Sequence, residues 1–187
     1  MTQNKTTLIS LKDFIKTGHF GLVKIGMTKD EVIKVLGQPD SDNDYGTGSG
    51  GMMFARYEFF YWQNNLKING IQNDHLQADC SNHKEMINFK NELWTIDKWF
   101  LQDNKNKTFG EVVELLNLEK ISFEIVPSYS GSNENVIKCL KSNVTFDFVN
   151  EYSQIELNEK GKFKTYKDYI EEEQSNYVLN GIRLFDY

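Results

Sequence analysis

The chain of 187 residues is poor in the features that mark a secreted or a membrane protein. It contains only two prolines and two cysteines, and it has no run of about 18 apolar residues that could form a transmembrane helix. Residues 1–10 are polar, without the apolar stretch and small-residue cleavage site of a signal peptide. These absences predict a cytoplasmic protein that does not insert into a membrane.

Cysteine and histidine are also scarce, which limits metal and redox chemistry. Cys80 and Cys139 lie far apart, and in a cytoplasmic protein we expect free thiols rather than a disulfide. The only cluster of metal-ligating residue types is His75, Asp79, Cys80 and His83. Its spacing lacks the fourth paired ligand of a zinc site, so we interpret it as a polar loop and predict no metal and no cofactor.

No catalytic motif is present. The three histidines are His19, His75 and His83, and none of them accompanies a nucleophile motif such as Gly-x-Ser-x-Gly. We therefore predict that the protein is not an enzyme.

What the chain does contain is enough apolar material for a core, together with a negative charge. Hydrophobic residues make up 39% and aromatic residues 13%, so we expect a single folded domain over residues 1–187. The formal net charge is −6 at pH 7, which argues against direct nucleic-acid binding, since nucleic-acid binders carry basic surfaces. The same charge is compatible with a basic protein partner.

The best-specified segment runs from Ile25 to Pro39 and predicts one short helix. Thr28 and Glu31 have the spacing of a capping box, in which each side chain accepts a hydrogen bond from the other residue's backbone N–H group. Gly37 can adopt a left-handed conformation that ends the helix, and Pro39 prevents its continuation. One face is apolar at Val32, Val35 and Leu36.

This helix has a counterpart on each side in the sequence. A first short helix is predicted to begin after Ser10 and to stop at Gly18. Residues 108–117 repeat the pattern of residues 28–37, with Thr, Glu, Val and Leu at identical offsets and Asn117 where Gly37 stands. We interpret the chain as two diverged halves, about residues 8–100 and 101–187. Chance recurrence of a common capping-box helix is the alternative.

Strand-like segments follow both capping-box helices. An aromatic-rich strand over residues 54–62 and a return strand over residues 66–71 predict a hairpin, and residues 93–101 predict a further strand. After the second helix we expect strands near 121–126, 136–140, 144–149, 154–157, 162–166 and 178–185, with a short helix over 165–174. The predicted fold class is α+β, with short helix–loop–helix elements packed on antiparallel sheet.

Residues 40–51, rich in Asp and Gly, predict a long flexible loop. The Asp40-x-Asp42-x-Asp44 spacing is similar to that of a calcium-binding loop. However, Tyr45 and Gly51 occupy the positions where an EF-hand loop needs Gly and Glu. The glycines do not form a phosphate-binding loop either, because the segment follows a helix and precedes a strand.

The segment Gly21–Asp40, followed by the aromatic strand and its return strand, resembles the G-M-T-x-x-E-V-x-x-x-L-G-x-P helix of the β-lactamase inhibitory protein-like superfamily. In length and order it is also similar to immunity proteins of bacterial polymorphic toxin systems, which act in contact-dependent inhibition. The resemblance implies an α+β fold and a function in binding another protein. It does not supply binding residues, because immunity interfaces lie in the variable surface.

We therefore predict a cytoplasmic immunity protein that blocks the active site of a cognate toxin, such as a basic nuclease-type domain. A ligand-binding or enzymatic α+β domain, and an envelope-assembly-like interaction module, remain the alternatives. The predicted contact residues lie in exposed acidic segments: Asp40, Asp42, Asp44, Tyr45, Glu171, Glu172 and Glu173. The rival surface is the aromatic strand, through Tyr57, Phe59 and Tyr61 or their opposite-face neighbours.

Overall fold

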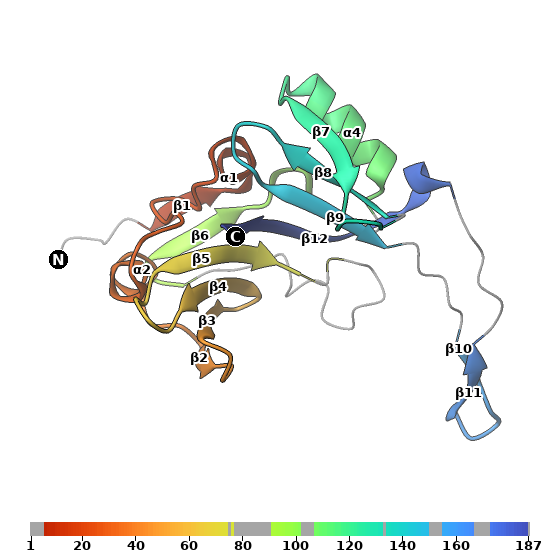
Figure 1. The fold of residues 1–187 in the computed structure, drawn as a ribbon, viewed down its shortest axis with the longest axis horizontal. Helices are drawn as coiled ribbons and strands as arrows, with labels where there is room; N and C mark the ends of the chain where they lie inside the picture. The colour runs from red at the N-terminus through yellow and green to blue at the C-terminus, as the bar shows by residue number, and fades with distance from the viewer. Residues whose placement is uncertain are drawn as a thin grey trace.

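In a computed structural model of the protein, residues 6–74, 76, 91–101, 107–132, 134–149, 155–166 and 173–186 are described. They form one eight-stranded antiparallel sheet, a two-stranded parallel sheet and a separate two-stranded hairpin, together with three α-helices (Figure 1). This is an α+β fold, as predicted.

The eight-stranded sheet has the order β2-β3-β4-β5-β12-β9-β8-β7. All its neighbours pair in antiparallel fashion, and β5 and β12 join the two predicted halves in the middle of the sheet. The strands are β2 (Ser41–Asp44), β3 (Ser49–Phe54), β4 (Tyr57–Trp62), β5 (Ile68–Asn73), β7 (Phe123–Pro127), β8 (Asn135–Cys139), β9 (Thr145–Val149) and β12 (Val178–Phe185).

The three α-helices begin where the sequence predicts. They are α1 (Leu11–Thr17), α2 (Lys29–Leu36) and α4 (Phe109–Leu118), with Ser10, Thr28 and Thr108 as N-caps and a complete capping box at each of the last two. Gly18 ends α1 in the left-handed conformation, as predicted, and α2 ends at the predicted position before Gly37. Two details of the predicted ends differ. Gly37 has a positive φ of 89° but a ψ of −166°, so it turns the chain without adopting the left-handed helical conformation. Asn117 lies inside α4 and does not end it.

The capping boxes provide a first testable prediction. The Thr28 hydroxyl accepts from the Glu31 N–H group at 3.3 Å, and the Glu31 carboxylate accepts from the Thr28 N–H group at 2.8 Å. We expect Thr28→Ala and Thr108→Ala each to lower the free energy of unfolding by about 1 kcal/mol in urea titrations. Thr47→Ala, at an exposed turn, is the control and should change it by less than about 0.5 kcal/mol. Equal effects at all three sites would contradict the prediction.

The two capped helices are attached to the sheet in the same way. Beside α2, the Lys29 N–H group donates to the Leu66 carbonyl at 2.8 Å, and the Ile68 N–H group donates to the Met27 carbonyl at 2.8 Å. Beside α4, the corresponding bonds run from Phe109 to Tyr177 at 2.9 Å and from Leu179 to Lys107 at 2.7 Å. Each helix start is therefore tied to the start of the strand, β5 or β12, that its own half contributes to the middle of the sheet. A common origin of the halves stays a prediction.

A small parallel sheet of β1 (Thr7–Ser10) and β6 (Trp94–Asp97) has no counterpart in the sequence prediction. The segment 93–101 was expected to be one strand, but β6 ends at Asp97 and a 3₁₀ helix, η1, covers Trp99–Leu101. The change of conformation occurs at Trp99, whose φ is +49°. A short strand and a 3₁₀ helix are hard to distinguish from composition, because both bury apolar side chains.

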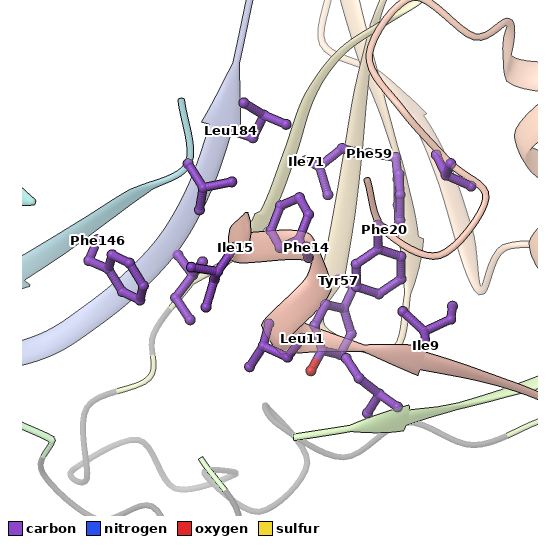
Figure 2. Packing of buried hydrophobic residues seen from close by; sticks show 14 of the residues in the cluster. Ile9, Leu11, Phe14, Ile15, Phe20, Tyr57, Phe59, Ile71, Phe146 and Leu184 are labelled. Atoms are coloured by element: carbon purple, nitrogen blue, oxygen red, sulfur yellow. The ribbon is translucent and has the colours of Figure 1, made fainter. Parts of the chain in front are cut away.

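The core lies between the sheet and the elements around α1 (Figure 2). Figure 2 shows the side chains of α1 pointing in two directions, with Ile15 on the side of Phe146 and Leu184, and Phe14 on the side of Phe20. The hydroxyl of Ser142 donates to the Ile15 carbonyl at 2.6 Å. A carbonyl group in the last turn of α1 therefore obtains its hydrogen-bond partner from the second half of the chain.

The remaining elements are short. β10 (Ile155–Leu157) and β11 (Phe163–Tyr166) form a hairpin closed by a turn at Asn158–Gly161, and it stands apart from the main sheet in Figure 1. The helix predicted over 165–174 is wrong at its ends, because Thr165 and Tyr166 belong to β11 and Gln174 begins the 3₁₀ helix η2 (Gln174–Asn176). Residues 167–172 lie outside the described residues.

Candidate functional site

One face of the eight-stranded sheet packs on the helices, and we call the opposite face the open face. Strand register defines it: Phe60 lies opposite Gly70 and Gly51, and Phe185 lies opposite Gly70 on the far side of β5. The buried side chains of the described helices lie on the other face, where they join the core cluster with Tyr57 and Phe59.

An aromatic row crosses the open face from β2 to β12. The ring centroids of Phe60 and Phe185 are 5.4 Å apart, and those of Tyr45 and Phe60 are 6.2 Å apart. Glycines make room for the rings, because a Cβ atom at Gly51 would collide with the Tyr45 hydroxyl and one at Gly70 would collide with the Phe185 ring. We define the aromatic row as Tyr45, Phe60, Phe185 and the neighbouring Trp62. Tyr45 is 44% exposed and Trp62 is 43% exposed.

Beside the aromatic row, two carboxylates share Arg183. One terminal nitrogen of the guanidinium lies 3.0 Å from Asp74 and 3.1 Å from Asp147, and Nε lies 2.9 Å from the second oxygen of Asp147. Asn180 also donates to Asp147 at 2.8 Å. Burial raises the pKa of Asp147 above its usual value, although the positive charge of Arg183 and the Asn180 hydrogen bond oppose the shift.

The open face has more acidic than basic groups. Gln72 donates a short hydrogen bond to Glu58, and Lys138 forms an ion pair of 3.6 Å with Glu124. Among the described residues, these contacts place the four carboxylates Glu58, Asp74, Glu124 and Asp147 on this face with the two basic groups Arg183 and Lys138. This arrangement can attract a basic surface.

The predicted loop at residues 40–51 is wrong, because Ser41–Asp44 and Ser49–Gly51 are paired strands of the β2–β3 hairpin. Loop composition misled the prediction, since the glycines serve the tight turn and the close approach of aromatic rings. Asp40 accepts from the Ala55 N–H group at 2.6 Å, and Asp44 accepts from the Gly46 N–H group at 2.8 Å. These carboxylates stabilise turns at the edge of the sheet, where charges also discourage pairing with another strand.

Asp42 points toward α2 rather than toward the open face. It forms an ion pair with Lys29 of α2 and accepts a hydrogen bond of 2.6 Å from the Tyr61 hydroxyl. Partial burial would raise the pKa of Asp42, but the hydrogen bonds from Lys29 and Tyr61 and the charge of Lys29 outweigh it, so the pKa lies below its usual value. Asp42 and Tyr45 therefore lie on opposite faces of the hairpin.

The lowered pKa of Asp42 gives a second prediction. A carboxylate with a lowered pKa stabilises the fold at neutral pH, and this stabilisation is lost as the pH falls through the folded-state value. We expect Asp42→Asn to lower the free energy of unfolding by up to about 1 kcal/mol near neutral pH, since the pair is partly exposed. The difference from the unmodified protein should vanish in acid. Asp44→Asn, which keeps an acceptor for Gly46, is the control, and a difference that persists in acid would refute the electrostatic cause.

The other predicted contact residues are not brought together. Glu173 is exposed and precedes η2, which packs beside α4 at the far side of the sheet from β2. Glu171 and Glu172 lie outside the described residues. Their role in binding stays a prediction, as does that of the three aspartates and Tyr45.

On the rival surface, period-two alternation separates two sets of aromatic residues. Tyr57, Phe59 and Tyr61 are at most 2% exposed and belong to the core, so they cannot contact a partner. Their opposite-face neighbours include Phe60 and Trp62 of the aromatic row. Sequence reasoning did not identify Phe185 or Arg183, because only the pairing of β12 with β5 places them beside Phe60 and Asp74.

The described residues include no group of three or more His, Cys, Asp or Glu side chains that could hold a metal ion. The cluster of His75, Asp79, Cys80 and His83 considered from the sequence lies outside the described residues. Cys139 is a free thiol, as predicted, and burial raises its pKa to about 11, so it is a poor nucleophile at neutral pH.

No protein-family model, curated protein or solved structure matches the chain. Among the described helices, none is both long enough and apolar enough to cross a membrane. A function for the chain therefore has to rest on the geometry and chemistry of its own surfaces.

Proposed function

We propose that the protein is a cytoplasmic immunity protein that binds a cognate bacterial toxin domain and occludes the toxin's active site. The observation that supports this proposal best is the open face, where exposed aromatic side chains stand on a rigid sheet beside an excess of carboxylates. The toxin is inferred from the sequence resemblance, and the surface is inferred from the structure.

The aromatic row has the chemistry of the centre of a protein interface. Tyr and Trp supply large contact areas with few rotatable bonds and dominate interface hot spots. Tyr45 and Trp62 are exposed, and the ring of Phe60, which contacts those of Tyr45 and Phe185, supports Tyr45 from within the sheet. Because the strands fix these positions, little conformational entropy is lost when a partner docks.

The carboxylates determine the kind of partner. Glu58, Asp74 and Asp147 lie next to the aromatic row, and the whole chain carries a net charge of −6. A basic toxin surface would be steered toward this face, and association would slow steeply as salt increases. A nuclease-type toxin domain has the required positive surface, since its substrate is a polyanion.

The proposal can be tested with the toxin domain encoded beside this chain. Co-expression should protect cells from that toxin, and the purified pair should form a complex whose association rate falls with salt. Trp62→Ala should weaken binding by about tenfold or more, whereas Tyr129→Ala, a 69% exposed aromatic residue outside the aromatic row, should leave it unchanged. Toxicity that persists despite co-expression would refute the function, and equal effects of both variants would refute the surface.

A second candidate function is small-ligand binding, which one specific observation favours. An apolar cleft lies beside α2, on a part of the molecule separate from the open face.

A further inference from the structure

An apolar cleft lies beside α2. It has a volume of about 450 Å³ and lies between α2, the preceding segment and the β1–β6 sheet. Its apolar lining comprises Ile9, Leu22, Met27, Val35, Leu36 and Trp94. The volume falls in the range of about 300–1,000 Å³ that is typical of small-molecule sites.

The walls of the cleft are fixed by hydrogen bonds, so it is already formed in the free protein. The Trp94 indole N–H group donates to the Leu36 carbonyl at 3.0 Å, and the Asn91 amide donates to the same carbonyl at 3.2 Å. These bonds join β6 to the C-terminal end of α2. At the rim, Leu22 is 73% exposed, which leaves apolar surface in contact with solvent.

The charges at the mouth favour an anion. Glu31 and Lys34 line the cleft, but the Glu31 carboxylate already accepts hydrogen bonds from the Thr28 N–H group and hydroxyl at 2.8 and 3.0 Å. Lys34 lines the mouth beside this engaged carboxylate, and Lys24, which lines a separate hollow, is close enough to act on Glu31 electrostatically. Among the described residues, Lys34 forms no salt bridge.

The second half of the chain offers an internal comparison. Along α4, the residues 80 positions later line a smaller cleft of about 280 Å³. Leu115 stands there in the position of Val35, and Glu114 stands in the position of Lys34. The helix face is therefore hollow in both halves. Lys107 lines the cleft along α4 but forms an ion pair of 3.4 Å with Glu111, whereas the cleft beside α2 has the larger apolar lining and, in Lys34, a lysine without a salt bridge to a described residue.

We propose that the cleft beside α2 binds a small amphiphile with a linear apolar tail and a carboxylate head, of the medium-chain fatty acid class. The tail contacts the apolar lining, and the head lies at the mouth near Lys34. This site is independent of the open face and of toxin binding.

The test titrates three probes with the same tail into the full chain: decanoate, decanol and decyltrimethylammonium. Binding is followed by calorimetry and by tryptophan fluorescence, since Trp94 lines the cleft. We expect decanoate to bind with one site per chain and more tightly than decanol, and the cation to bind most weakly. Octanoate lacks two methylene groups and should bind roughly fifteenfold more weakly, at about fourfold per methylene. Absence of decanoate binding, or equal binding of all three head groups, would overturn the proposal.

Matched variants locate the site. Val35→Trp fills the cleft and should abolish decanoate binding, whereas Leu115→Trp, at the corresponding position of α4, should not affect it. Lys34→Glu should weaken the binding of decanoate and leave the affinity for decanol unchanged. Leu22→Asp, at a 73% exposed position, tests the rim without disturbing the core and should also weaken decanoate. Binding that survives both Val35→Trp and Leu22→Asp would place the ligand elsewhere and refute the site.

Discussion

Phe20→Ala is expected to lower the free energy of unfolding by about 3–5 kcal/mol, the range measured when a fully buried aromatic ring is removed. Phe20 has no exposed surface, and its ring centroid lies 5.2–5.8 Å from those of Phe14, Tyr57, Phe59 and Trp94. These residues come from α1, β4 and β6, so one side chain connects three elements (Figure 2). The cavity left by alanine could not collapse without moving all three.

Urea or thermal unfolding monitored by circular dichroism would measure this effect. Phe20→Leu keeps most of the volume and should cost less than about 2 kcal/mol. Phe60→Ala is the matched control from the open face, where the ring is half-buried and its removal leaves no enclosed cavity. If Phe20→Ala and Phe60→Ala were equally destabilising, the assignment of the two sheet faces would be wrong.

The second large effect is expected at Arg183. Arg183→Ala leaves Asp74 and Asp147 close together without their shared cation, and we expect a loss of about 2–3 kcal/mol at neutral pH. The value is below that for a fully buried pair, because the arginine side chain is 32% exposed. The measurement is the free energy of unfolding from urea titrations at several pH values.

The pH dependence of this variant has a definite sign. The pKa of Asp147 is already raised by burial, so ionisation of Asp147 opposes folding above that pKa, and loss of Arg183 raises the pKa further. The destabilisation by Arg183→Ala should therefore shrink as the pH is lowered from about 7 toward about 5. The double variant Arg183→Ala with Asp147→Asn should be more stable than Arg183→Ala alone. A loss that is independent of pH and is not rescued would point to lost packing rather than to charge.

Sequence signals that act within a few residues predicted the local structure well. Ser10, Thr28 and Thr108 start their helices as expected, because a capping hydrogen bond depends only on residues three positions apart. The β4–β5 hairpin and the strands after α4 were also found, since alternating apolar residues bounded by turn residues favour paired strands wherever they lie.

Residues 40–51 show where local signals fail. Their composition is typical of a loop, yet β2 and β3 form because Met52 and Phe54 bury their side chains in the core, and β2 then pairs along the edge of β3. The energy that holds this hairpin comes from residues outside the segment 40–51. Composition alone therefore assigned Asp40, Asp42 and Asp44 to a recognition loop, while the fold gives each of them a hydrogen-bonded role.

The sequence alone determined the helix starts, most strands, the α+β class and the recurrence of one capped helix, because these depend on short-range hydrogen bonding and on periodicity. Only the tertiary structure decided which face of the sheet is open and which residues meet there. The pairing of β5 with β12 brings Arg183 to Asp74, more than 100 positions away, and Phe185 to Phe60. It also decided that β6 closes a cleft against α2. Such contacts depend on the summed burial of many side chains, and no local pattern encodes that sum.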